Sequence, residues 1–375
     1  MLPRGPFFLL LPILALGLAP LGGALPATRQ EIEVPLPPVS PRRLMAHVEF
    51  LASEELRGRE AGSVSERVAA LYASTRLEAA GVRPLQGGRR FQEFALPQRF
   101  LAWTSEASGP PRELREAQET SRNVLGFVEG AQPDLRDEIV VLGAHLDHLG
   151  VREGKTYRGA EDNASGVAVV LELASLLEAS SDLLGRSVLV VFFGAEERDM
   201  DGSRAFVREP PVERGRIAAM VNVDMIGRPL ADQKALSGAK SLLGIDGSRS
   251  VGILGTRGRA SFRRIVDAAC ARAGLRAFAP EDFPPPLSTF LEKETRDRGD
   301  HAAFERAGIP ALFFGSGESD DYHAPTDTPE RLDPSLMVRR AQAIYATVLA
   351  LSVAAPAGTP ASRAGAPASG PASPK

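Results

Sequence analysis

The chain has 375 residues, of which 43% are hydrophobic and 24% charged, and its formal net charge is -3. These values are typical of a globular protein with one large α/β core or two small domains. The small net charge and the lack of a local basic patch exclude a general attraction to nucleic acid or anionic membranes, so we expect neither as a partner. No pattern in the sequence predicts an oligomeric state.

Residues 1–27 have the composition of a secretory signal peptide. Arg4 precedes an apolar run that ends in small residues, and the next charge is Arg29. Prolines and a Gly-Gly pair interrupt this run before it reaches the ~20 residues that a spanning helix needs. We therefore favour cleavage after Ala24 or Ala27 over a membrane anchor. The expected product is exported, periplasmic or extracellular, with no stable membrane association after cleavage.

A helix is expected in SVSERVAALYASTRLEAAG (63–81). It starts with Ser63 and Glu66 at capping-box spacing and stops at Gly81, before Pro84. The single cysteine, Cys270, lies in a helix-like stretch and is expected to be a small buried residue. It allows no internal disulfide and lies far from the signal cleavage site, which argues against a lipid anchor.

Four short apolar runs follow along the chain, with a helical pattern at 166–180 between the first two. The runs are rich in β-branched residues, and helical patterns separate them. Both features are typical of parallel strands covered on both faces. The prediction is an α/β fold, a three-layer α/β/α sandwich with a mainly parallel mixed sheet. The runs are EIVVLGAH (138–145), SVLVVFFGAEE (187–197), AAMVNVDMIG (218–227) and IPALFFGSG (309–317). Residues 355–375 are Pro, Ala, Gly and Ser with few exceptions and are expected to form a disordered tail.

Histidines and carboxylates stand directly after these runs, on a chain with only five histidines. Sites in open α/β sheets form at the carboxyl ends of the strands, so these side chains are expected to converge. Imidazole and carboxylate without thiolate is the ligand set of zinc, or less often cobalt or manganese, in a hydrolytic site. The residues are His145 and Asp147, Asp162 ahead of the central helix, Glu196 and Glu197, Asp224, and His323.

The ordered motifs around these residues resemble the M28 family of di-zinc aminopeptidases. They are GAHLDHLG, GAEDNASG, FFGAEERDMDGS, VNVDMIGR, RGDHAAFERAGIP and YHAPTDTPERLD, and the upstream HVEFLASEELRGREAGS resembles the opening of many bacterial members. The likeness runs from His47 to Asp333. It implies a fold of the zinc-dependent exopeptidase type and an exported enzyme that removes N-terminal residues from peptides.

The resemblance also implies a role for each residue and two Zn²⁺ per chain. Asp162 bridges the two ions, His145 and Asp224 complete one, and Glu197 and His323 complete the other. Asp147 holds the His145 ring from behind. Glu196 is the general base for a metal-bridging water.

Each of these residues also has a structural interpretation. Asp224 alone is a possible turn former, Glu196 with Glu197 a solvated pair, and Asp162 a helix N-cap. The remaining histidines are interpreted as non-ligands: His148 and His301 as packing or ligand-supporting residues, and His47 as structural. Asp300 is expected at the rim of the site, with a hydrogen-bonding role.

Two departures from the family pattern concern loops. Asp199 and Met200 replace a Gly-Leu pair, which puts the local loop shape in question. The interval from Phe94 to Asn123 is too short for the protease-associated insert of larger members. We therefore expect a single catalytic domain at residues 28–354.

Three alternatives remain at this point. A glutaminyl-cyclase-like acyltransferase shares the fold and uses one zinc, but the DNASG sequence after Asp162 favours hydrolysis. A carboxypeptidase of the same fold needs a cationic clamp, which Arg257 and Arg259 could supply. A binding module without metals is disfavoured because all five ligands and the base are present. For an aminopeptidase, Glu318, Asp320 and Asp321 are candidates to hold the substrate amine, unless they are solvated loop charges.

Overall fold

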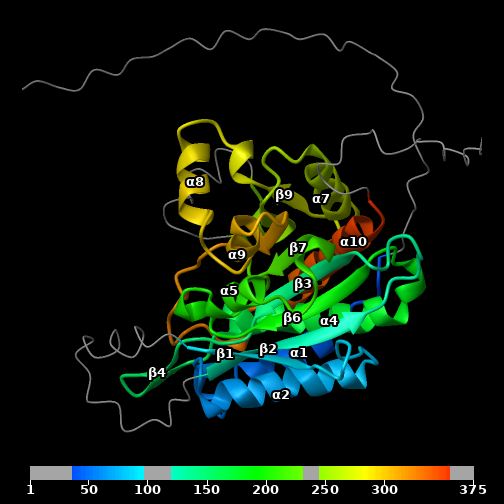
Figure 1. Cartoon of the computed structure of the whole chain (residues 1–375). Coiled ribbons are helices and arrows are strands. Elements are labelled where there is room, and N and C mark those ends of the chain that lie inside the picture. The colour runs from blue at the N-terminus through cyan, green and yellow to red at the C-terminus, as the bar shows by residue number, and fades with distance from the viewer. Residues whose placement is uncertain (1–35, 97–119, 231–244, 355–375) are drawn as a thin grey trace, which may run out of the picture. The chain divides into compact units, whose positions relative to one another are not determined.

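A mixed sheet of eight strands lies at the centre of the computed structural model of the chain, which describes residues 36–96, 120–230 and 245–354 (Figure 1). The strand order is β1-β2-β6-β3-β7-β10-β8-β9. Two further short strands form a separate hairpin. The strands are β1 (Phe91–Ala95), β2 (Thr120–Val128), β3 (Ile139–His145), β4 (Gly150–Arg152), β5 (Lys155–Tyr157), β6 (Ser187–Phe193), β7 (Ile217–Val223), β8 (Ser250–Leu254), β9 (Arg276–Phe278) and β10 (Ala311–Gly315), with β4 and β5 in the hairpin.

The four predicted apolar runs are the four central strands. β6, β3, β7 and β10 are neighbours and all pair in parallel. Every residue of β3 and β6 is buried, which explains why these runs carry no polar alternation. β2 joins β6 and β8 joins β10 in antiparallel pairs, so the predicted mainly parallel mixed sheet is confirmed.

Helices cover both faces of this sheet (Figure 1). α4 and α10 pack on β3 from one side, and α1 packs on both helices. α5 and α9 pack on the other side, against β2 and against β7 and β10. The α/β sandwich is therefore confirmed. The helices are α1 (Pro41–Leu51), α2 (Val64–Ala79), α4 (Gly166–Ala179), α5 (Asp201–Arg208), α7 (Ala260–Arg272), α8 (Leu287–Thr295), α9 (His301–Arg306) and α10 (Pro334–Val353).

An aromatic cluster fills the space between the sheet and the α5/α9 layer. Phe193, Phe206 and Phe304 are fully buried, with ring centroids 5.3 to 6.0 Å apart. Each such side chain stabilises the fold by about 1.5–3 kcal/mol through burial. A Cβ on Gly143 would lie 2.6 Å from the Phe193 ring, so the glycine makes room for it. Because Phe193 ends β6, this rigid packing fixes the strand end from which Glu196 and Glu197 follow.

The helix predicted within residues 63–81 is confirmed as α2. Its N-cap is Ser63, whose Oγ accepts from the backbone N–H of Glu66 at 3.1 Å. The Glu66 carboxylate does not return to Ser63. It accepts from Gly62 N at 2.6 Å and from Ser121 Oγ at 2.5 Å, and so ties α2 to the start of β2. Gly81, with φ of 81°, follows the helix as expected.

Among the described residues, α10 is long and apolar enough to cross a membrane, but 67% of its apolar 18-residue stretch is buried inside the fold. It packs against α1, α4 and α7, as a core helix does. Cys270 is buried in α7, as predicted. The described residues all fall within one compact unit. The predicted signal peptide (1–27) and tail (355–375) lie outside the described residues.

Candidate metal centre

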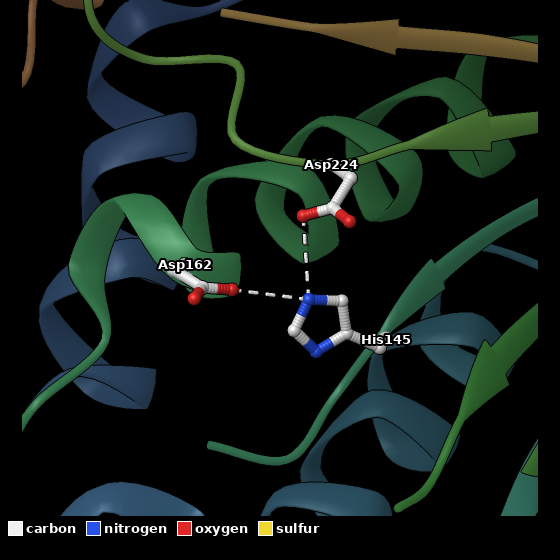
Figure 2. Close-up of side chains that lie close together, drawn as sticks. All are labelled: His145, Asp162 and Asp224. Carbon is white, nitrogen blue, oxygen red and sulfur yellow. Dashed lines mark hydrogen bonds and ion pairs between the residues drawn. The ribbon is translucent and has the colours of Figure 1, made fainter. Parts of the chain in front are cut away.

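The carboxyl ends of the central strands bring the predicted ligands together. His145 is the last residue of β3 and pairs with Phe193, the last residue of β6. Asp224 directly follows β7. His145 Nε2 lies 3.1 Å from Asp162 Oδ1 and 3.3 Å from Asp224 Oδ1, and the three side chains point toward one another (Figure 2). The expected convergence at this edge of the sheet is observed.

A second group of donors forms on the other side of Asp162. His323 Nε2 lies 3.2 Å from Asp162 Oδ2 and 3.1 Å from Glu197 Oε2. His148 Nδ1 lies 2.8 Å from Glu197 Oε1 and 3.7 Å from Asp162 Oδ2. Asp162 therefore presents Oδ1 to the first group and Oδ2 to the second.

These donors fit two cations. Within each of two triplets, one donor atom per residue lies within 4.8 Å of the others: His145, Asp162 and Asp224, and His148, Asp162 and Glu197. Asp162 belongs to both triplets, with a different oxygen in each. Burying several carboxylates together costs free energy unless cations compensate their charge. The donor set, nitrogen and oxygen without sulfur, suits zinc.

The pKa directions express the same excess of negative charge. Burial and neighbouring carboxylates raise the pKa of Asp224 above its ordinary value. Burial alone would lower the pKa of His145, but Asp224 and Glu196 hold it well above the ordinary value of a histidine. Burial would raise the pKa of Asp162, yet hydrogen bonds from His145 and His323 hold it well below its ordinary range. Carboxylates here keep their charge where a cation lies beside them.

Asn163 explains why the DNASG sequence surrounds this centre. Its Oδ1 accepts from Gly166 N at 3.0 Å and from Met225 N at 3.1 Å, and its Nδ2 donates to Val223 O at 3.0 Å. The amide thus joins the start of α4 to the end of β7. A Cβ on Gly166 would lie 2.2 Å from Asn163 Oδ1, so only glycine fits there. Asp162 and Asp224 are consequently held in one frame.

The turn that carries Asp162 is also fixed by Asp327. Its buried carboxylate accepts from Glu161 N at 2.9 Å and from Asp162 N at 3.1 Å. Gly159 has φ of 59°, and a Cβ there would lie 2.5 Å from the His148 ring. The turn can therefore approach His148 closely only with a glycine at this position.

Asp147 lies beside the centre, but its contacts differ from the prediction. The His145 ring contacts the backbone carbonyl of Asp147, with Nδ1 at 3.2 Å, whereas the carboxylate is 3.9 Å from Nδ1. The carboxylate instead accepts from Glu196 N at 2.8 Å and from Glu197 N at 3.2 Å. Asp147 thus anchors the turn after β6. Sequence spacing does not separate these roles, because carbonyl and carboxylate of one residue are both near the ring.

Glu196 and Glu197 lie on a 3₁₀ turn, Glu196–Arg198, that follows Ala195 with φ of 56°. The Glu197 carboxylate contacts His148 and His323. Burial raises the pKa of Glu196 well above its ordinary range.

The loop in question after this turn passes through Asp199 and Met200 with φ of 70° and 60°. This region favours glycine, so the conformation needs support from neighbours. The Asp199 carboxylate pairs with the Arg204 guanidinium, and the Met200 side chain is buried. These contacts hold a glycine-like turn without a glycine.

Two of the three candidate carboxylates before His323 are bound to protein partners, and the third, Asp320, stays a candidate. Asp321 pairs with Arg228 at 2.5 Å and accepts from Thr326, and Glu318 pairs with Arg298. These two carboxylates are therefore structural, and the expectation that they hold a substrate amine is not supported.

Arg257 and Arg259, the candidate carboxylate clamp, are likewise engaged. Arg257 pairs with Glu292 at 3.2 Å, and Arg259 binds both oxygens of Glu305 at 2.8 Å. They line a cavity of about 380 Å³ beside α8 and α9, and none of the five predicted metal ligands lines it.

Asp300 is not a rim residue. Its side chain is fully buried, and the Ser203 hydroxyl is its hydrogen-bonding neighbour, which opposes the effect of burial on its pKa. Burial raises its pKa to about 7. His301 packs against Phe313, with ring centroids 5.1 Å apart, which agrees with a packing role. His47 contacts Tyr72 OH through Nδ1 at 2.8 Å and lies away from the centre.

Sequence reasoning did not identify three residues that shape the centre. They are Asp327, the anchor of the Asp162 turn, Tyr322, whose ring stacks on His323 with centroids 3.8 Å apart, and Arg59, a buried guanidinium. In YHAPTD, Tyr322 directly precedes His323 and Asp327 follows it by four residues, which was an available signal. His148 does more than pack, because its Nδ1 lies 2.8 Å from Oε1 of the predicted ligand Glu197.

Comparison with known proteins agrees with these observations. The chain is 30% identical over 277 residues to the probable lipoprotein aminopeptidase LpqL of Mycobacterium tuberculosis, covering 68% of this chain and 51% of that protein. It is 32% identical over 198 residues to an aminopeptidase of Pseudomonas aeruginosa, covering 52% of this chain and 31% of that protein. The chain thus spans about half the length of these relatives, or less.

Solved structures share the fold at low identity. The zinc aminopeptidase BSAP of Bacillus subtilis matches with a TM-score of 0.60 and 17% identity, over 84% of this chain and 95% of that one. A glutaminyl cyclase of Bacteroides thetaiotaomicron matches with a TM-score of 0.56 and 15% identity, over 84% and 99%. The model of Peptidase family M28 matches residues 123–348, more than half of the sequence. The chain therefore belongs to peptidase family M28.

Proposed function

We propose that this chain is a zinc-dependent exopeptidase, an aminopeptidase that hydrolyses the N-terminal residues of peptides. The observation that carries the proposal is the position of Asp162, whose two oxygens face two separate donor groups at 3.1 and 3.2 Å. A carboxylate in this position can bridge two ions. Family membership supports the same reaction class.

Two Zn²⁺ ions per chain would be held by five side chains. His145 and Asp224 would hold one, Glu197 and His323 the other, and Asp162 both. Bound zinc would polarise the scissile carbonyl and make an attacking water more acidic. The five ligands carry three negative charges against four positive ones, and the remaining positive charge favours an anionic transition state.

Glu196 is the proposed general base. Its carboxylate takes a proton from the attacking water and delivers it to the leaving amine. Asp147 holds the backbone of Glu196 and Glu197 through two hydrogen bonds, so the base and the adjacent ligand keep a fixed relation to each other. The Nε2 atoms of His145 and His323 lie 3.1 and 3.2 Å from the Asp162 carboxylate, so both rings turn toward Asp162 the nitrogen that would hold zinc.

The two alternative activities are less well supported. A carboxypeptidase needs a free cationic clamp, and both candidate arginines are paired with glutamates in a cavity that the metal ligands do not line. A glutaminyl-cyclase-like acyltransferase shares the fold, so the fold does not distinguish this activity from that of an aminopeptidase. The second donor group around Glu197 and His323, together with the first around His145, favours two metals over one.

The proposed location is outside the cytoplasm, periplasmic or extracellular, after removal of residues 1–27. The signal-like composition of this segment supports export, and one similar protein is named a lipoprotein aminopeptidase. The proposed catalytic domain is residues 28–354, with peptides as substrates and neither nucleic acid nor membrane as a stable partner.

Peptides blocked at either end test the assignment. Purified protein with zinc is incubated with one peptide sequence in its free, N-acetylated and C-amidated forms. An aminopeptidase cleaves the free and amidated peptides and spares the acetylated one. Cleavage that depends on a free C-terminus would point to a carboxypeptidase. Cyclisation of an N-terminal glutamine, with one tightly bound zinc, would point to the acyltransferase.

A further inference from the structure

Arg59 lies in the segment SEELRGREAGS (53–63), upstream of the residues that the family model matches. Its side chain is 1% exposed, although it is a long cation. Buried arginines are rare unless their donors are satisfied. The partners of this guanidinium therefore indicate its purpose.

Backbone carbonyls of three separate segments surround the guanidinium. Nε donates to Leu146 O at 2.9 Å, Nη1 to Arg158 O at 2.8 Å, and Nη2 to Gly159 O at 2.9 Å. Nη1 also donates to Leu51 O, at the end of α1. One rigid planar group thus joins α1, the loop after β3 and the turn before α4.

Two of these carbonyls lie next to proposed metal ligands. Leu146 directly follows His145, and Gly159 lies three residues before Asp162. His145 Nε2 and Asp162 Oδ1 are 3.1 Å apart, so their separation depends on how these two segments are held. The Arg59 side chain contacts both segments at once.

The backbone around Arg59 is also fixed against the site. Arg57, Gly58 and Arg59 have φ of 45°, 70° and 48°, a conformation that persists only where neighbours impose it. A Cβ on Gly58 would lie 2.2 Å from Tyr157 O, so this turn is pressed onto the β4/β5 hairpin. Arg59 O accepts from His148 N at 3.3 Å.

The charge of Arg59 also affects metal binding, and a test must separate this effect from that of the hydrogen bonds. Burial lowers its pKa to about 10, and nearby Asp147 and Asp162 oppose that shift, so the group stays charged at neutral pH. A fixed positive charge behind the centre repels a metal cation. Charge alone would therefore make removal of Arg59 strengthen metal binding, whereas loss of its hydrogen bonds would weaken it.

We propose that Arg59 is a positioning residue which sets the zinc affinity of the centre by holding the His145 loop and the Asp162 turn at a fixed separation. This inference rests on the proposed two-zinc function. It makes the N-terminal segment 53–63 a working part of the site, although it carries no metal ligand.

The test compares Arg59→Lys and Arg59→Met with a matched control, Arg186→Lys. Arg186 is equally buried at 1% and donates to Glu138 and to carbonyls at the end of α10, beside the first residue of β6 and away from the metal-binding edge. Zinc affinity is measured on the full mature chain by competition with a chelating dye, at a temperature where each zinc-free variant remains folded. The kcat and KM for a free peptide are measured in parallel.

Both Arg59 variants should bind zinc about 10–100-fold more weakly than wild type, the usual effect of removing a group that orients metal ligands. Arg186→Lys should lower the melting temperature and leave zinc affinity within about twofold. At saturating zinc, kcat should fall in the Arg59 variants with little change in KM. Wild-type zinc affinity in Arg59→Lys, or tighter binding in Arg59→Met, would overturn the proposal.

A measurement on the unmodified protein covers the case in which the Arg59 variants do not fold. Adding zinc to the zinc-free protein should slow amide hydrogen exchange in residues 57–62, because linkage between the segment and the metal is reciprocal. Unchanged exchange there would overturn the proposal. Failure of the wild type to bind two zinc ions would instead refute the proposed function, whatever the variants do.

Discussion

Replacement of Asp147 by asparagine tests how the centre is held together. The carboxylate accepts from the backbone N–H groups of Glu196 and Glu197 at 2.8 and 3.2 Å. Asparagine has nearly the same shape, but one of its two terminal groups is an NH₂ donor. One backbone N–H group would then face another donor. The change disturbs both glutamates without creating a cavity.

The expected cost follows from these two contacts. A hydrogen bond to a charged acceptor contributes about 1.5–3 kcal/mol, and a buried donor without an acceptor adds its desolvation. Since Asp147 is fully buried, the free energy of unfolding should fall by about 2–4 kcal/mol. Because the folded domain is large, the melting temperature should fall by only roughly 3–7 °C. Because Glu197 shifts, zinc should bind about 10–100-fold more weakly, and kcat should fall as Glu196 loses its position.

The assay combines calorimetry of the zinc-free protein with zinc competition and peptide hydrolysis at pH 8. Burial raises the pKa of Asp147 to about 6, so the wild-type carboxylate is charged at that pH. Asp137→Asn is the control, because Asp137 is exposed and its contact with Arg216 is long, at 3.8 Å. This substitution should change none of the three readings. Wild-type zinc affinity and kcat in Asp147→Asn would refute the anchoring role.

Three further predictions concern the base, the pH dependence and the N-terminus. Glu196→Gln should keep its metal while kcat falls ~10²–10⁴-fold, whereas Glu197→Gln should lose part of its zinc on dialysis because an amide is a poorer ligand; metal analysis showing the reverse would exchange the two roles. Burial lowers the pKa of His47 to about 4, below the ~6.5 of an unfolded histidine, so the stability that neutral His47 contributes is full above pH 6.5 and is lost as the pH falls toward 4. Urea unfolding should show a loss of about 2 kcal/mol between pH 7 and 5 that His47→Gln reduces, and identical pH profiles would contradict this. N-terminal sequencing of the exported protein should begin near Leu25 or Thr28, and an intact Met1 on a membrane-bound protein would contradict the signal peptide.

The strands and the donors at their ends were predictable because both depend on local patterns. Fully buried parallel strands leave continuous apolar runs, and the side chains that follow them must meet at one edge, as His145 and Asp224 do. The order of the motifs then indicated the family.

The supports of the centre were less predictable because they join residues far apart in the chain. Arg59 bonds to carbonyls 87 and 100 residues away, and carbonyl partners leave no trace in side-chain identity. Asp321 pairs with Arg228 across 93 residues, which turned a candidate amine-binding group into a structural one. Only the three-dimensional arrangement shows these partners.

Anomalous diffraction at the zinc edge from crystals of the zinc-loaded protein tests the central claim most directly. We predict two peaks roughly 3.5–4 Å apart, one beside His145 and Asp224 and one beside Glu197 and His323, with Asp162 between them. A single peak, or peaks that Asp162 does not contact, would contradict a two-zinc exopeptidase.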